Sequence, residues 1–482
     1  MNTRSVQVLR VVGRRALAAA AGARLGLAPR AESRQAAARQ VRLACEELGP
    51  TFAKIGQLIS VRPDVFPPEL CFELEGLQDT MAPLSYAEVA QVIREEFGRD
   101  PEQLFATFDP EPTASASIAQ VHRATLQEAS RPVWGETMVA GSPVAVKVVR
   151  PGIERYIAAD LATARRIVGW LSRFGAVRRW SIDGLIEELG TSLRRELDLR
   201  NEARVSDRFA FDFRDDSRVL VPRVVWGRTT RRVLTMEFVN GWRLSALNDA
   251  VRNGVDARGL AVHGARVFMR QVLVHGRFHA DLHPANLLVT RDNRIAYLDF
   301  GIVGMLTSRE RVAVAQILAA LVFRDPERAL RYSGELGVKI PAVKTAALSH
   351  GLSRLMDQKR AVGSVNGAEI SAHSFTDGSS GDMGGDCACA VQRASLDVKD
   401  FGIGLLSLLA RHEIEIPVGY GLLVKSLVTI EGVARALYPD IDIVETARPF
   451  VTRLLLQGMD GGGVSLKKYE AAVRAALREL TS

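Results

Sequence analysis

The chain has 482 residues, which is enough for two or three domain-sized units. Its 47% hydrophobic and 24% charged residues are typical of a globular protein, four cysteines exclude a disulfide framework, and no apolar run reaches the length of a membrane-spanning helix. The net charge of +8 favours an anionic partner such as a nucleotide or an acidic lipid surface. We do not expect a role with nucleic acid, because the net charge alone would support it.

Residues 1–40 form a basic segment, since residues 1–42 hold nine arginines and one acidic residue, Glu32. Three interpretations stay open: a mitochondrial transit peptide, an amphipathic helix on a membrane surface, and a basic bacterial N-terminus without a partner. We expect a cytoplasmic protein, with a peripheral contact to the inner membrane as one alternative, or a mitochondrial protein if the source is eukaryotic.

Residues 41–104 are expected to form a helical extension. Apolar residues recur at helical spacing over 41–59, and this single predicted helix contains the motif K-I-G-Q from Lys54 to Gln57. The residues Ser85 to Glu88 predict a capping box, and the helix that it starts is predicted to end at Phe97.

Strands are predicted from Phe105 onward, and one of them, over 144–149, contains the tetrapeptide V-A-V-K. The turn between the first two strands is built from four small residues: Ala114, Ser115, Ala116 and Ser117. Small side chains let the backbone close over the phosphates of a nucleotide, and Lys147 would reach those phosphates as a point charge. The polar connection over 127–142 is longer than a hairpin requires and is predicted to be a surface insertion.

Helical periodicity resumes over 153–203 and includes Glu196 and Glu202. Two interpretations of these glutamates stay open. They are either partners for lysines across a cleft or members of a charged face that is exposed to solvent.

A further strand is predicted over 232–236. The run Met236–Gly241 continues it into a hinge, where the adenine of a nucleotide would lie. Glu237 and Val239 are the candidate contacts for that adenine.

The chemistry is concentrated in H-A-D-L-H-P-A-N and in the L-D-F-G that follows. Asp281, then Asn286 five residues later, then Asp299 follow the order in which kinase-like folds carry their catalytic loop and magnesium ligands. Asn286 and Asp299 offer the hard oxygen ligands that magnesium prefers. Asp281 is the candidate to orient or deprotonate an acceptor hydroxyl. Strands over 287–289 and 295–298 are predicted to join these motifs as a hairpin.

The C-terminal half is predicted to be mostly helical. The apolar run over 312–323 is bounded by arginines and is interpreted as a buried core helix. Residues 371–390 are rich in Gly, Ser and Asp and are predicted to form a flexible, disordered surface loop, in which Cys387 and Cys389 have no assigned role. Residues 466–480 are predicted to form a last amphipathic helix.

Together these motifs resemble the UbiB/AarF-type atypical kinases, which include the ADCK proteins and act around ubiquinone and other isoprenoid lipids. The resemblance covers about 41–442, and its most specific pieces include K-I-G-Q, T-A-S-A-S-I-A-Q-V-H-R-A, V-A-V-K, E-L-D-L-R-N-E-A, H-A-D-L-H-P-A-N and L-D-F-G. It implies an α+β, bilobal protein-kinase-like fold with a helical N-terminal extension and a mostly helical C-lobe. It also implies ATP and Mg²⁺ as cofactors.

Carried over by position, the resemblance implies that Lys147 binds phosphates and pairs with Glu202. It implies that Asn286 and Asp299 hold magnesium, while Asp281 takes the catalytic-loop place.

The family's signature helix would lie across the cleft and carry Lys54 and Gln57, with Lys54 near Glu196 and Asp198. Residues 114–117 correspond to the family's alanine-rich loop.

Two departures from the family pattern stand out. Ser115 occupies a position where the family usually has Ala, and Leu282 and Ala285 occur where D-P-H-P-G-N is usual. None of these residues bears a ligand, so we expect them to affect rate rather than binding.

The expected organisation has five parts in chain order: a basic segment 1–40, a helical extension 41–104, an N-lobe 105–240, a C-lobe 241–445 and C-terminal helices 446–482.

Two function hypotheses stay open, with a protein kinase as a third. The first is an ATPase or small-molecule kinase whose acceptor is water or the headgroup of an isoprenoid or quinone-precursor lipid. The second is an ATP-gated scaffold that presents lipid precursors to quinone-biosynthesis enzymes with little turnover. Ala280 stands where the Arg of H-R-D would bind an activation-loop phosphate, and no A-P-E follows Gly301, so a peptide substrate is disfavoured.

Overall fold

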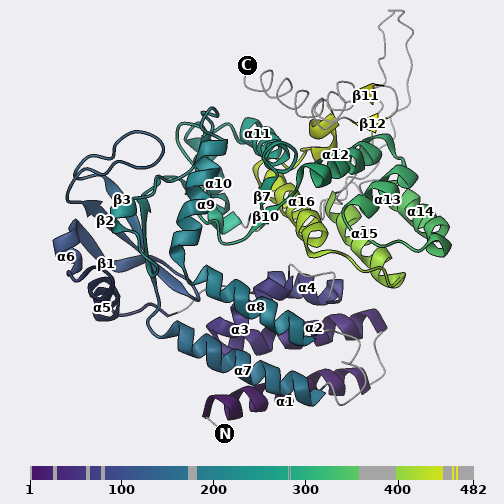
Figure 1. Ribbon diagram of the computed structural model, residues 1–482, viewed down its shortest axis with the longest axis horizontal. Coiled ribbons are helices and arrows are strands. Elements are labelled where there is room, and N and C mark those ends of the chain that lie inside the picture. Colours follow the sequence, from purple (N-terminus) through teal and green to yellow (C-terminus); the bar gives the residue numbers. More distant parts are fainter. Residues whose placement is uncertain are drawn as a thin grey trace, which may run out of the picture.

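The structure is a computed structural model that describes residues 3–24, 30–60, 66–77, 82–171, 182–280, 282, 284–357, 398–448, 459–460 and 463–464. It consists of an N-lobe with a sheet, a mostly helical C-lobe and a layer of helices below both (Figure 1). This mixture of helix and sheet confirms the predicted α+β class. Among the described helices, none combines the length and the apolar composition needed to cross a bilayer.

The lower layer contains α1 (Thr3–Arg24), α2 (Arg30–Leu48), α3 (Pro50–Ser60), α4 (Pro68–Glu75), α7 (Ile153–Leu171) and α8 (Ile182–Glu196). The prediction of one continuous helix over 41–59 is wrong, because the chain breaks between α2 and α3. Gly49 has a φ of +90°, which glycine adopts without strain, and Pro50 then begins α3. The break lets α3 contact both α7 and α8.

The N-lobe sheet is antiparallel and has the strand order β1-β2-β3-β5. Its strands are β1 (Phe105–Ser115), β2 (Ala119–Leu126), β3 (Pro143–Val149) and β5 (Val233–Glu237). Before it come α5 (Tyr86–Phe97) and α6 (Pro101–Leu104), and α5 starts with the predicted capping box between Ser85 and Glu88. The predicted insertion over 127–142 is mostly exposed and is held by a bridge between Ser130 and Met138.

The C-lobe has a small sheet of order β4-β9-β8-β6 and a separate pair, β7 with β10. Its strands are β4 (Val219–Leu220), β6 (Trp242–Arg243), β7 (Arg277–His279), β8 (Leu287–Val289), β9 (Ile295–Tyr297) and β10 (Val303–Met305). The antiparallel pair of β8 and β9 confirms the predicted hairpin between the two motifs.

The C-lobe helices carry most of the core. They are α9 (Leu199–Asp212), α10 (Leu247–Arg252), α11 (Ala257–Arg270), α12 (Ser308–Phe323), α13 (Pro326–Glu335), α14 (Ala342–Asp357), α15 (Val398–Arg411) and α16 (Val418–Leu437). Of these helices, α9 joins the two lobes. Two short strands, β11 (Met459–Asp460) and β12 (Gly463–Val464), follow α16. The prediction of a buried helix over 312–323 is confirmed by α12. The predicted loop 371–390 and the predicted helix 466–480 lie outside the described residues.

A group of buried charges supports the end of α11, where a single π turn, Gln271–His275, leads into β7. Arg270 binds Asp216 at 2.5 Å, and Arg277 binds Asp212 at 2.6 Å. His275 lies 3.7 Å from Asp212. Burial and the nearby arginines outweigh that carboxylate and lower the pKa of His275 to about 4.

We therefore predict that His275 makes the fold less stable in acid. Its unfolded-state pKa is near 6.5, so between about pH 6.5 and pH 4 the unfolded chain binds a proton that the folded chain does not. The free energy of unfolding should fall by about 3 kcal/mol across this range on account of His275. Urea unfolding at several pH values should show a shallower pH slope for His275→Gln. The exposed His350, changed to Gln, is the control that should keep the wild-type slope, and equal slopes for all three proteins would contradict the prediction.

Candidate active site

Lys147 lies near the middle of the N-lobe sheet, and the alternation of β3 decides which way it faces. Val144, Val146 and Val148 are buried in the cluster that also contains apolar residues of α5. Because successive side chains of a strand point to opposite faces, Lys147 faces the other side of the sheet. There Val149 packs in the same cluster as Leu199 of α9.

The Lys147 ammonium lies between two carboxylates from distant parts of the chain. Its Nζ donates to Oε1 and Oε2 of Glu202 on α9, both at 2.8 Å, and lies 3.5 Å from Oδ2 of Asp299. The charged ends of Lys147 and Glu202 are largely buried, whereas the Asp299 side chain keeps 38% of its surface exposed. The structure therefore favours the first interpretation of Glu202, as a partner for a lysine across the cleft.

The position of Asp299 is fixed by its own backbone and by the hairpin before it. The amide of Gly301 donates to Oδ1 of Asp299 at 2.8 Å. The amide of Leu298 donates to the carbonyl of Asn286 at 3.0 Å, which places the two candidate magnesium ligands on neighbouring ends of β8 and β9.

Two residues that sequence reasoning did not single out support this arrangement. His279 contacts the Asp299 carbonyl through Nε2 at 2.5 Å, and its own amide donates to Oε1 of Gln271 at 3.0 Å. Gln271 is fully buried in the π turn. The His that opens H-A-D was a visible signal for His279, whereas Gln271 lies outside every motif.

Lys147, Glu202 and Asp299 shift one another's pKa values. Burial disfavours ionisation of Asp299, but Lys147 and Lys54 outweigh it and hold the pKa of Asp299 at about 2. Burial also opposes the Lys147 ammonium, yet Asp299 and Glu202 raise its pKa above the usual value. Burial raises the pKa of Glu202 to about 7 despite the attraction of Lys147. Asp299 is thus a partly exposed, ionised carboxylate at neutral pH.

A second ion pair links the helical extension to the surroundings of Lys147 and Asp299. Lys54 on α3 binds Glu196 at the end of α8, with only 12% and 14% of these side chains exposed. Within the K-I-G-Q motif, a Cβ at Gly56 would lie 2.3 Å from Cδ1 of Leu77, so glycine permits this close packing of α3. Gln57 follows on α3 and is partly buried.

Asp198 is the N-cap of α9. Its side chain accepts from the amide of Arg200 and also binds the Arg200 guanidinium at 2.7 Å. The cap helps to fix the first turn of the helix that carries Glu202.

Arg150, which the sequence did not point to, holds the loop of small residues. Its guanidinium donates to the carbonyl of Ala116 at 3.0 Å and to the hydroxyl of Ser115 at 2.7 Å. It also reaches the carbonyl of Ala82 before α5 at 3.0 Å. Ala114 pairs with Val121 at the end of β1. Ser117 completes the loop as a buried residue.

In the hinge after β5, the Glu237 side chain binds Arg223. Its carboxylate binds the guanidinium of Arg223 at 2.7 and 2.8 Å, and its amide donates to the Arg223 carbonyl at 2.9 Å. The next amide, of Phe238, donates to Pro143 at 3.0 Å. Because the carboxylate and the amide of Glu237 both bind Arg223, any contact of Glu237 with adenine would have to come from the Glu237 carbonyl. Val239 is partly buried.

The residues present fit a magnesium ion. Asn286 and Asp299 supply neutral and ionised oxygen donors, and Mg²⁺ is usually held by one or two such side chains together with substrate phosphates. In the described part of the chain, no group of three or more His, Cys, Asp or Glu could hold a metal alone. Asp281 lies outside the described residues.

Two protein-family models match the chain. The ABC1 atypical kinase-like domain matches residues 76–333, and the UbiB helical domain matches residues 399–442. Together with the mixed architecture, these matches confirm the predicted kinase-like fold.

Individual proteins are similar over most of the chain. A probable protein kinase UbiB from Cellvibrio japonicus is 33% identical over 430 residues, which cover 86% of this chain and 69% of that protein. The chloroplastic protein ACTIVITY OF BC1 COMPLEX KINASE 8 from Arabidopsis thaliana is 32% identical over 85% of this chain and 53% of its own length. The solved complex of Rv3197 with erythromycin from Mycobacterium tuberculosis covers 80% of this chain and 91% of that one, with 20% identity and a TM-score of 0.46.

The buried pair of Lys54 and Glu196 should be strongly coupled. Lys54→Met leaves a buried carboxylate near Asp299 without its partner, and should lower the free energy of unfolding by about 3 kcal/mol. Adding Glu196→Leu should restore most of this loss, because no charge is then left unpaired. Denaturant unfolding of the four proteins of this cycle measures the coupling.

The exposed pair of Arg231 and Glu154, with 51% and 50% of the side chains exposed, is the matched control. Arg231→Met should cost less than about 1 kcal/mol. Similar costs at both pairs, or a double variant no more stable than Lys54→Met, would show that the inner pair is not coupled.

Proposed function

This chain belongs to the ABC1/UbiB family of atypical kinases, and from that premise we propose that it uses Mg-ATP as an ATPase or small-molecule kinase in the metabolism of ubiquinone or another isoprenoid lipid. The observation that carries the proposal is the Lys147 ammonium held between Glu202 and the partly exposed carboxylate of Asp299. Phosphoryl transfer needs positioned cations more than covalent chemistry, and this arrangement holds one cation beside one candidate magnesium ligand.

Each part of the nucleotide has a candidate contact in the proposed complex. The adenine would bind the hinge through the backbone at Glu237 and Val239, and the phosphates would lie under residues 114–117, with Lys147 beside them. Magnesium, when bound by Asn286 and Asp299, would neutralise charge that develops on the transferred phosphoryl group. Asp281 would orient or deprotonate the acceptor.

The surroundings of the site favour a small acceptor. Lys54 brings α3 to the same group of charges, and α12 begins at Ser308, three residues after β10. A peptide substrate would have to displace the pair of Lys54 and Glu196, so a lipid headgroup or water fits better than a protein chain. Quinone-biosynthesis enzymes and a peripheral membrane surface are the partners that we propose for this function.

One observation favours a second candidate function, an ATP-gated scaffold. The pair of Lys54 and Glu196 closes the extension onto the site with both side chains largely buried. If ATP binding opened this pair, the extension could change its exposed surface without turnover. The full set of Lys147, Asp281, Asn286 and Asp299 favours catalysis, because a scaffold has no physical need for all four.

We predict that purified protein releases ADP from Mg-ATP and that Asp299→Asn lowers this rate by at least about 100-fold, because magnesium loses an ionised ligand. Anionic liposomes that carry a phenolic, quinone-like headgroup should raise the wild-type rate. ADP release with and without these liposomes is the measurement.

Asp292→Asn is the matched control, since Asp292 is an exposed aspartate of the same hairpin that binds Arg294. It should keep the wild-type rate. If the wild type binds ATP but releases no ADP under any of these conditions, the scaffold function replaces the enzymatic one.

A further inference from the structure

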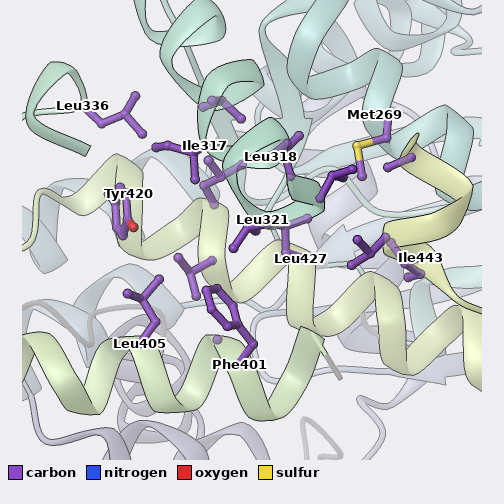
Figure 2. A pocket seen from close by; sticks show the side chains of 17 residues that line it. Met269, Ile317, Leu318, Leu321, Leu336, Phe401, Leu405, Tyr420, Leu427 and Ile443 are labelled. Carbon is purple, nitrogen blue, oxygen red and sulfur yellow. The ribbon is translucent and has the colours of Figure 1, made fainter. Parts of the chain in front are cut away.

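The C-lobe contains a hollow between α12, α15 and α16 (Figure 2). It has a volume of about 70 Å³ and is partly open to solvent. Protein interiors are normally packed with few voids larger than one water molecule. The hollow is therefore larger than an ordinary packing defect.

The walls of this cavity are almost entirely apolar. In Figure 2, Phe401 and Leu405 extend from α15 toward Leu321 of α12 and Leu427 of α16. Tyr420 also lines the cavity, and its hydroxyl interacts with Ser333. A polar ligand would lose its hydrogen bonds to water here without replacement, and a water molecule needs two or more polar partners. The chemistry of the walls thus selects a hydrocarbon.

The cavity does not result from loose packing of these helices in general. A Cβ at Gly402, which lines the cavity on α15, would lie 2.8 Å from Cγ2 of Val428 and 3.3 Å from Cγ1 of Val424 on α16. The two helices are therefore in close contact at one side of the hollow and leave space at the other. The hollow therefore lies beside helices that are otherwise closely packed.

The cavity is partly open to solvent. Its volume of about 70 Å³ exceeds the roughly 10–15 Å³ that one water-sized group needs, so several such groups fit next to one another. A hydrocarbon chain can therefore enter the cavity while a polar head stays in the solvent.

We propose that this cavity binds the hydrocarbon chain of a lipid, with the polar head of that lipid at the mouth. Prenyl and straight acyl chains share the required chemistry. The proposal goes beyond the nucleotide site, because none of the cavity's lining residues belongs to that site and binding here needs no ATP turnover.

The test is equilibrium binding of a fluorescent polyene fatty acid to the full-length chain, followed by displacement with farnesol or dodecanol. The wild type should bind one probe per chain. Displacement by farnesol alone assigns a prenyl ligand, displacement by dodecanol alone assigns an acyl ligand, and displacement by both assigns a site for either.

Ala447→Leu places three more carbon atoms on a buried lining residue and should weaken binding by about tenfold. Ala346→Leu makes the same change at an exposed position of α14 and should bind as the wild type does. Val314→Leu, a filling change on α12, serves as a second variant if Ala447→Leu does not fold. No saturable binding to the wild type, or equal affinities of the filled and control variants, would overturn the proposal. Failure of ADP release would leave this result unaffected.

Discussion

The structure depends on one buried ammonium group that must be neutralised where three parts of the chain meet. Lys147 comes from the N-lobe sheet, Glu202 from α9 and Asp299 from the segment after β9, and their contacts join the two lobes. A buried lysine without a carboxylate would lose its charge or destabilise the fold. Asp299 keeps part of its surface exposed while it neutralises Lys147, so the contact that supports the fold also presents a candidate ligand for a cation.

The helical extension adds a second ion pair to this centre without forming part of either lobe. Lys54 reaches Glu196, and both lie close enough to Asp299 to influence its pKa or to be influenced by it. Arg150 makes a comparable link, since it joins the loop of small residues to the backbone before α5. The extension is thus connected to the metal side and to the phosphate side of the proposed nucleotide site. This arrangement gives a physical basis for coupling nucleotide binding to the position of α3.

Much of the fold could be predicted because its signals are local. The capping box at Ser85 and the hairpin between Asn286 and Asp299 each depend on residues only a few positions apart. The break at Gly49 was missed because apolar periodicity continues across it. Arg150 and Gln271 were missed because a contact over 68 residues, or an amide buried in a π turn, leaves no pattern in the sequence. The motifs identified Lys147 and Asp299, but their distances, and the apolar cavity in the C-lobe, required the structure.

We propose that Asn286 and Asp299 hold the metal of a bound nucleotide. Manganese can replace magnesium at such oxygen sites, and electron paramagnetic resonance measures free and bound Mn²⁺ directly. In the presence of ATP, the wild type should bind manganese, and Asp299→Asn and Asn286→Ala should each weaken this binding by about tenfold or more. ATP-dependent manganese binding that is unchanged in both variants would contradict the account.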